Sequence, residues 1–248
     1  MYPSRFRYAA PRTLDEAIAL LAEHGDDAKV LAGGQSLVPL LKLRFAAPAL
    51  LVDINNLTGL GHHQEDGDGT LRVGALCRHA DPQGDWAAVM IALGCSIVAQ
   101  GRTGRRSIPV AQFVLGPFQN ALRPGEIAVE AVVPPAAGTV SGSYLKLERR
   151  VGDFATAGVA VALERSGATV TRAGIALTGV GAATIHATAA EEALVGKPLT
   201  EETIELAATR AAEAAQPRSD HRGSADYKRH VVATFVRRGL ARDLEAAA

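Results

Sequence analysis

Hydrophobic residues recur at helical spacing directly after a capping sequence near the start of the chain. Thr13-Leu14-Asp15-Glu16 has the pattern of a capping box, and apolar residues then recur every three or four positions as far as Gly25. A short apolar run ending at Leu31 stops at Gly33-Gly34, which is typical of a buried strand that enters a sharp turn. Leu37, Leu40 and Leu41 then resume the helical spacing. This region predicts a helix, a strand, a glycine turn and a second helix, in that order.

The middle of the chain alternates between strand-like and helix-like patterns. Residues 71–76 are expected to form a strand after an Asp/Gly-rich loop, and residues 86–93 are expected to form a helix. Polar and apolar residues alternate over 95–99, and the chain is expected to reverse at Gly101-Arg102-Thr103-Gly104 into a partner strand at 106–108. These features predict a β-hairpin.

A boundary is expected where Pro134-Pro135-Ala136-Ala137-Gly138 is followed by Ser141-Gly142-Ser143, because both stretches are turn-prone and lack periodicity. Residues 144–148, 155–164 and 169–180 are expected to form a three-stranded antiparallel sheet. Capping residues and alanine-rich or amphipathic patterns predict helices over three later ranges: 187–195, 200–215 and 224–238. The fold class is therefore α+β, with predicted domains at residues 1–138 and 143–244.

Composition narrows the class of protein. The 248 residues are 48% hydrophobic, and 26 basic side chains balance 26 acidic ones, so nothing indicates binding to nucleic acid or to an anionic membrane. The start of the chain lacks the apolar core of a signal peptide, and no apolar run is long enough to cross a bilayer. We therefore expect a cytoplasmic protein. Two cysteines, Cys77 and Cys95, are too few to ligate an iron–sulfur cluster, and we expect both to be ordinary buried thiols.

The segment from Leu31 to Leu37 is the strongest candidate for chemistry. Glycine has no Cβ and tolerates positive φ, so successive amides can converge on an anion, and Ser36 can add a hydroxyl. A nucleotide phosphate would fit such a turn. The alternative is a tight turn that binds nothing.

Other polar groups give weaker signals. His79 and Asp81, with His62-His63 upstream, match no zinc-binding spacing, so no metal is expected. Arg102, Arg105 and Arg106 are interpreted as a solvated hairpin tip, with contact to a partner as the alternative. Opposite charges between residues 218 and 229 are interpreted as a salt-bridged helical face. No Ser/His/Asp or paired-carboxylate arrangement is found, so no catalytic residue is predicted.

Five segments in order along the chain closely resemble the medium, FAD-binding subunit of molybdenum hydroxylases, the family that includes carbon monoxide dehydrogenase and xanthine dehydrogenase. The resemblance covers nearly the whole sequence and is far more specific than one pair of glycines. The segments are AGGQSLVPLLKLRFAAPALLVDI from Ala32, HADPQGDWAAVM from His79, LGPFQNALRPGE from Leu115, YLKLERRVGDFATAGVAVALE from Tyr144 and PRSDHRGSADYKRHVV from Pro217.

The resemblance implies a PCMH-type FAD-binding domain, like that of vanillyl-alcohol oxidase, followed by a C-terminal domain with a sheet and helices. It implies electron transfer through FAD, with an iron–sulfur subunit as donor and a molybdopterin-binding subunit that oxidises the substrate. It also makes residues 218–229 an inter-subunit surface. One alternative is a flavin-free structural or assembly subunit of such a complex. A stand-alone flavin oxidase is less favoured because no substrate-site constellation is found.

The resemblance also implies which residues bind FAD. The glycine turn, Asp85 and Lys146 match family positions at the diphosphate, at the cofactor and at the isoalloxazine ring, respectively. Judged by position alone, Asp85 could instead cap the helix that follows it, and Lys146 could be an ordinary solvated lysine on a strand. The full set of expected FAD-binding residues is Leu31, Ala32, Gly33, Gly34, Gln35, Ser36, Leu37, Asp85 and Lys146.

The chain departs from the family in one place. Relatives carry a helical stretch and a second glycine motif, Thr-Ile/Val-Gly-Gly-Ser, before the segment that matches His79-Ala80-Asp81-Pro82. Here Leu76-Cys77-Arg78 leads directly into His79, so a few tens of residues are missing and the domain is shortened near residues 76–82. Deletion of the residues between two similar His-Ala-Asp sequences would explain the missing segment. The same deletion would remove half of the backbone amide donors expected around the flavin diphosphate.

Overall fold

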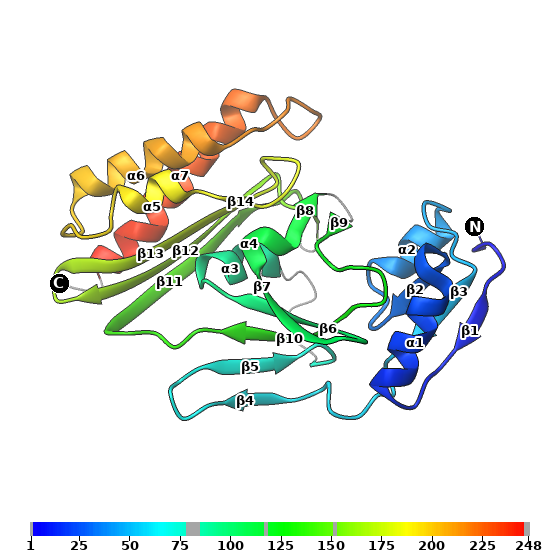
Figure 1. The fold of residues 1–248 in the computed structure, drawn as a ribbon. Helices are drawn as coiled ribbons and strands as arrows, with labels where there is room; N and C mark the ends of the chain where they lie inside the picture. Colours follow the sequence, from blue (N-terminus) through cyan, green and yellow to red (C-terminus); the bar gives the residue numbers. More distant parts are fainter. Residues whose placement is uncertain (1, 78–84, 117–118, 151–152, 246–248) are drawn as a thin grey trace.

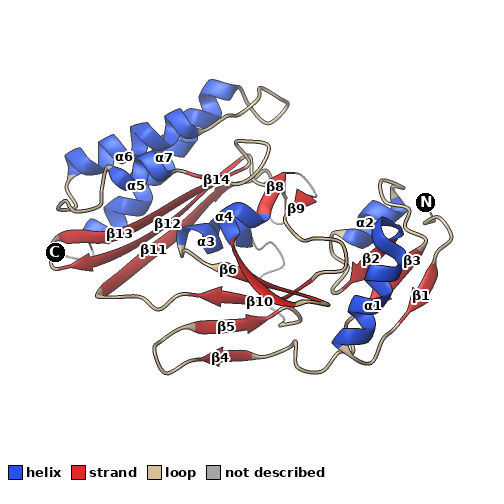
Figure 2. Cartoon of the chain, in the orientation of Figure 1, coloured by secondary structure: helices blue, strands red, loops and turns tan. Residues whose placement is uncertain are grey.

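The computed structural model describes residues 2–77, 85–116, 119–150 and 153–245, and it shows helices and sheets in an α+β arrangement (Figures 1 and 2). The position of the shortening, between Arg78 and His79, lies outside these described residues. Within them, no helix is both long and apolar enough to span a membrane.

The first part of the chain forms a small parallel sheet with two helices. Thr13 caps α1 in the capping box that the sequence predicts, and α1 ends at Gly25, which has a φ of +51°. The sheet has the order β1-β3-β2, and α1 packs its buried face against it (Figure 1). The elements are β1 (Arg7–Ala9), α1 (Leu14–His24), a 3₁₀ turn (Gly25–Asp27), β2 (Ala28–Leu31), α2 (Leu37–Lys42) and β3 (Leu50–Asp53).

A five-stranded antiparallel sheet follows, with the order β4-β5-β10-β6-β7. The predicted hairpin is confirmed: Gly101 pairs with Gly104, and Ile97 lies opposite Ile108. The predicted helix before it is also confirmed, as α3. The elements are β4 (His63–Glu65), β5 (Leu71–Gly74), α3 (Trp86–Ala92), β6 (Ser96–Gly101), β7 (Gly104–Pro109), α4 (Val110–Phe113), the short pair β8 (Val114–Gly116) and β9 (Gln119–Asn120), and β10 (Ile127–Val133).

The last part is an antiparallel sheet with helices on one face (Figure 1). The three predicted strands are present, and a two-residue strand, β14, adds a fourth. The first strand begins at Thr139, so the interpretation of Ser141-Gly142-Ser143 as a turn-prone boundary is wrong: these residues pair with β12. The division into domains at residues 138 and 143 stays a prediction. The elements are β11 (Thr139–Leu147), β12 (Ala157–Ser166), β13 (Thr169–Thr178), β14 (Ile185–His186), α5 (Thr188–Glu192), α6 (Glu201–Ala214) and α7 (Ala225–Glu245).

The two faces of this sheet carry side chains of different size. Val159, Val161 and Leu163 project into the core beneath α5, α6 and α7. The alternate positions, Ala160 and Ala162, face α3, which packs across β12 and β13 from the opposite side (Figure 1). Small residues on that face let the helix approach closely, so α3 is sandwiched into the second half of the fold although it comes from the first half of the sequence.

Candidate functional site

The glycine turn has the backbone geometry that the sequence predicts. β2 ends at Leu31, Gly34 has a φ of +85°, and α2 begins at Leu37. The carbonyl of Gly34 accepts a hydrogen bond from Val38 N (2.9 Å). In the described part of the chain, the amides of residues 33–36 donate to no acceptor, and a Cβ placed on Gly33 would meet nothing within 4 Å. These four amides are available to an anion.

Asn55 braces this turn from the end of the neighbouring strand. Its side-chain amide donates to Ala32 O (2.7 Å) and to Asp53 Oδ1 (2.7 Å), while Tyr8 donates its hydroxyl to the other oxygen of Asp53 (2.5 Å). The sequence pattern did not identify Asn55 as a site residue. The available signal was its place directly after the buried strand that pairs with β2, where a polar side chain lies beside the turn.

Asp85 and Lys146 are brought together from distant parts of the sequence. Lys146 Nζ lies 3.1 Å from Asp85 Oδ2 and 3.1 Å from Glu148 Oε2. The side chain of Lys146 is only 12% exposed, so the interpretation as a solvated lysine is wrong. Asp85 occupies the N-cap position of α3 without a side-chain capping hydrogen bond, so the capping interpretation is also wrong. The carboxylate is turned toward Lys146 instead.

Tyr144 completes this partly buried polar cluster, which consists of Asp85, Tyr144, Lys146 and Glu148. Burial raises the pKa of the Tyr144 hydroxyl, and the adjacent Asp85 carboxylate raises it further. Burial alone would lower the pKa of Lys146, but the carboxylates of Glu148 and Asp85 outweigh it and the pKa is raised. The ammonium is therefore charged at neutral pH, and the sequence analysis did not identify Tyr144 or Glu148.

These residues fit FAD on two grounds. The glycine turn offers unengaged amides to a diphosphate. In the polar cluster, Lys146 offers a largely shielded cation, held between Asp85 Oδ2 and Glu148 Oε2, and a cation of this kind suits the negative charge of a reduced flavin. Among the described residues, no hydrogen bond or ion pair joins the turn to the cluster, so the predicted FAD-binding residues form two separate groups.

The basic hairpin residues differ from the prediction of a solvated tip. Arg106 makes a bidentate contact with Glu126 (2.8 and 2.7 Å) and also donates to Ala121 O (2.7 Å). This pairing lowers the pKa of Glu126. Arg106 therefore holds the hairpin against the loop before β10, and the interpretation of the cluster as a solvated tip is wrong for this residue.

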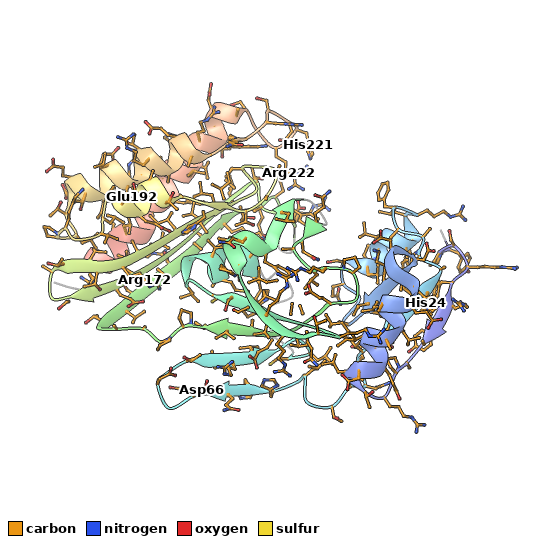
Figure 3. The ribbon with its side chains drawn as sticks, in the orientation of Figure 1. His24, Asp66, Arg172, Glu192, His221 and Arg222 are labelled. Atoms are coloured by element: carbon orange, nitrogen blue, oxygen red, sulfur yellow. The ribbon has the colours of Figure 1, made fainter. Side chains whose placement is uncertain are left out.

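The charged segment at residues 218–229, which continues into the first turn of α7, is partly internal. Lys228 is only 3% exposed, and its ammonium contacts Asp220 Oδ2 (2.8 Å) and Arg218 O (2.9 Å). Arg222, labelled in Figure 3, pairs with Asp153 (3.0 Å) and donates to Phe154 O (2.9 Å). These contacts fix the loop structurally, and a role as an inter-subunit surface remains a prediction.

The described residues contain no group of His, Cys, Asp and Glu that could hold a metal ion. His79 and Asp81 lie outside them. Cys95 is buried as predicted, and burial raises its pKa to about 11, so the thiol is unreactive at neutral pH. Cys77 is only partly buried.

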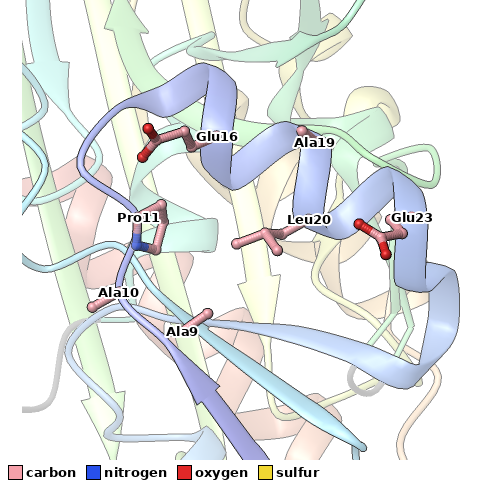
Figure 4. A pocket seen from close by; sticks show the side chains of 7 residues that line it. All are labelled: Ala9, Ala10, Pro11, Glu16, Ala19, Leu20 and Glu23. Carbon is pink, nitrogen blue, oxygen red and sulfur yellow. The ribbon is translucent and has the colours of Figure 1, made fainter.

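An open pocket of about 400 Å³ lies between α1 and the chain that leads into it (Figure 4). Its acidic wall includes Glu16, which already accepts hydrogen bonds from the backbone of Arg12 and Thr13. The pocket contains none of the predicted FAD-binding residues. It is lined by Ala9, Ala10, Pro11, Glu16, Ala19, Leu20 and Glu23.

Two family models match the chain. The FAD-binding domain of molybdopterin dehydrogenases matches residues 4–81 and 78–136, and the C-terminal domain of CO dehydrogenase flavoproteins matches residues 142–242. The first match is in two pieces that overlap at residues 78–81, where the sequence analysis places the missing segment.

Relatives cover the chain from end to end. The medium chain of carbon monoxide dehydrogenase from Hydrogenophaga pseudoflava is 36% identical over 280 aligned positions, covering 97% of both chains. The glyceraldehyde dehydrogenase medium chain of Sulfolobus acidocaldarius is 32% identical and covers 94% of this chain and 96% of its own. Because 97% of this chain is about 241 residues, the first alignment leaves about 40 positions of the relative without a counterpart here.

Solved structures share the fold over the same extent. Carbon monoxide dehydrogenase from Hydrogenophaga pseudoflava lacking the Mo-pyranopterin moiety matches with a TM-score of 0.91 at 38% identity, covering 97% of this chain and 98% of the other. Quinoline 2-oxidoreductase from Pseudomonas putida 86 matches with a TM-score of 0.88 at 29% identity, covering 100% and 99%. The chain therefore belongs to the FAD-binding medium subunits of the carbon monoxide dehydrogenase and xanthine dehydrogenase family.

Proposed function

We propose that this chain holds FAD as an electron-transfer subunit, receiving electrons from the iron–sulfur clusters of one partner and passing them to an acceptor. Two features described above carry the proposal: a turn with four unengaged amides, and a largely shielded lysine in a polar cluster. FAD supplies the chemistry of accepting electrons singly and releasing them in pairs. A second partner, which binds molybdopterin, would oxidise the substrate.

The residues of this chain have binding and electrostatic roles in this proposal. The amides of residues 33–36 would hold the diphosphate, with the Ser36 hydroxyl beside them. The Lys146 ammonium would place positive charge near the isoalloxazine ring, which favours added negative charge on reduction. Asp85 would accept hydrogen bonds from hydroxyl groups of the cofactor. A cytoplasmic location remains a prediction.

Replacing Gly34 by valine is expected to weaken FAD binding at least tenfold. A Cβ there would lie 3.1 Å from Val38 Cγ2, and a φ of +85° is strained for any β-branched residue, so the turn must change shape. FAD content and thermal unfolding would be measured together. Gly61→Val is the matched control because that glycine has no neighbour within 4 Å of its Cβ position and no positive φ. Unchanged FAD content in Gly34→Val would contradict the assignment.

Co-expression with the iron–sulfur and molybdopterin subunits of the complex is expected to yield a three-subunit assembly. The flavin in that assembly should be reduced when substrate is added, and it should stay oxidised when the iron–sulfur subunit is omitted. Size-exclusion chromatography and flavin absorbance at each step provide the measurement. Migration as a lone monomer in the presence of both partners, or reduction without the iron–sulfur subunit, would argue against the proposed electron route.

The alternative of a flavin-free assembly subunit has one observation in its favour, the roughly 40 positions of a relative that have no counterpart here. Flavin absorbance distinguishes the two functions. A colourless assembly that contains all three subunits and resists reconstitution with FAD would support the alternative. A yellow assembly that releases FAD on denaturation supports electron transfer.

A further inference from the structure

We propose that Glu148 is a positioning residue that fixes the Lys146 ammonium and lowers the reduction potential of the flavin bound beside it. This inference rests on the proposed function, because it assumes that Lys146 faces the isoalloxazine ring. It concerns a residue whose role neither the sequence pattern nor the resemblance assigns, and it begins from the arrangement of four side chains around α3.

Strand periodicity explains how the cluster is assembled. Tyr144, Lys146 and Glu148 are spaced two residues apart, so they project from the same face of the chain at and just beyond the end of β11. Tyr144 packs in the apolar cluster that includes α3 residues such as Ala88. This face is therefore the one toward α3, and Asp85 at the start of that helix meets the same lysine.

The two carboxylates of the cluster have different surroundings. Asp85 lies beside the hydroxyl of Tyr144 as well as the ammonium of Lys146. Within the described part of the chain, Glu148 makes one ion pair, and its partner is Lys146. The ammonium is therefore held between two carboxylates at equal distances of 3.1 Å, and Glu148 depends on Lys146 for its ion pair.

The charges of the cluster do not cancel. Two carboxylates and one ammonium leave a net charge of −1, and the side chains of Lys146, Asp85 and Glu148 are only 12%, 18% and 20% exposed. Partly buried charges are screened less by salt than exposed ones. The negative charge of Glu148 offsets the positive charge that Lys146 presents, so Glu148 disfavours reduction of a flavin at this position relative to Lys146 without it. Removing one carboxylate would leave a neutral Lys146–Asp85 pair.

The test uses Glu148→Gln, which keeps the shape of the side chain and removes its charge. The ratio of the Kd values for oxidised and reduced FAD is measured by titration under anaerobic conditions. We expect this ratio to rise about tenfold in the variant, which corresponds to a potential about 30 mV higher for a two-electron couple. Lys146→Met is expected to shift the ratio in the opposite direction.

Glu205→Gln is the matched control. Glu205 pairs with Arg237 (2.5 Å) on the exposed surface between α6 and α7, so its loss removes an ion pair without touching the cluster. The ratio should not change in this control. A ratio that is unchanged or lower in Glu148→Gln would overturn the electrostatic role of Glu148.

A second measurement does not depend on flavin. Unfolding in denaturant of the two single variants, Glu148→Gln and Lys146→Met, and of the double variant tests whether the residues act as a unit. We expect the effects on the unfolding equilibrium to depart from additivity by about fivefold or more, and additive effects would overturn the positioning role. Failure of the unaltered protein to bind either form of FAD would overturn the proposed function and the electrostatic role with it, while coupling would still establish that Glu148 positions Lys146.

Discussion

Replacing Gly174 by valine is expected to destabilise the protein by about 3 kcal/mol, at the upper end of the cost of overpacking a core. Gly174 lies on β13 where α3 crosses the sheet, and a Cβ at this position would overlap the carbonyl oxygen of Ala92. That oxygen belongs to backbone and cannot rotate away as a side chain can. The helix must therefore move off the sheet, and the contact between Asp85 and Lys146 should loosen with it.

The measurement is the denaturant midpoint of Gly174→Val, together with its FAD affinity. Gly67→Val, in the loop between β4 and β5, is the control because nothing lies within 4 Å of its Cβ position. We expect the control to unfold like the unaltered protein. A Gly174 variant with an unchanged midpoint would mean that the packing of α3 on β13 adjusts without cost, contrary to the close approach described here.

The other end of α3 is held by charge as well as by packing. Arg172 on β13 donates to Ala92 O (3.0 Å) and pairs with the buried carboxylate of Glu164, whose second oxygen accepts a hydrogen bond from Ala137 N (2.9 Å). Figure 3 shows Arg172 on this sheet. The helix thus contacts the second half of the fold at both ends, through Asp85 and through Ala92. Geometry at the polar cluster depends on this packing.

Local signals in the sequence predicted local structure well. The capping box at Thr13, the positive φ of Gly34 and the hairpin between Gly101 and Gly104 each depend on residues within a few positions of one another. In each case a single backbone requirement, either a cap or a turn, limits the residue types that fit. This is why the glycine turn could be placed to the residue.

Long-range contacts could not be predicted in the same way. The pattern of Lys146 between Leu145 and Leu147 is that of a solvated strand residue, and its contact with Asp85, 61 positions earlier in the sequence, could not be predicted from that pattern. Arg106 is similar, because its partner Glu126 lies on a separate loop. Ala160 and Ala162 carried a signal that the sequence interpretation did not use. Small residues that alternate with large ones along a strand indicate that both faces of the sheet are covered and that one of them is closely packed.

The short strand β14 was missed because two residues carry no periodicity. It forms only because Ile185 and His186 lie along the edge of β13, opposite Leu177 and Ala176. His186 is held there by Glu191 (2.8 Å), and this contact raises the pKa of the histidine. Pairing of this kind depends on the unpaired backbone groups at the edge of the existing sheet. The sequence of the short segment that pairs there does not by itself predict it.

Restoring the segment that relatives carry is expected to tighten FAD binding by about 3–6 kcal/mol, or roughly 10²- to 10⁴-fold in Kd. Without it, the unengaged amides of residues 33–36 are the diphosphate donors in our proposal. An insert between Arg78 and His79, with the helical stretch and a Thr-Ile-Gly-Gly-Ser loop, would add converging amides and cover apolar surface. Each charge-assisted hydrogen bond gained contributes about 1.5–3 kcal/mol, so two suffice for the expected change.

The measurement is titration of both proteins with FAD, followed by fluorescence quenching. An insert of the same length in which the Gly-Gly pair is changed to Val-Val separates the added amides from mere bulk, because β-branched residues cannot adopt the positive φ that such a turn uses. This control should bind FAD no more tightly than the unaltered chain. Equal and tight affinity of the chain with and without the insert would show that the shortened domain closes the diphosphate site by other means, and that the glycine turn with its brace at Asn55 is sufficient.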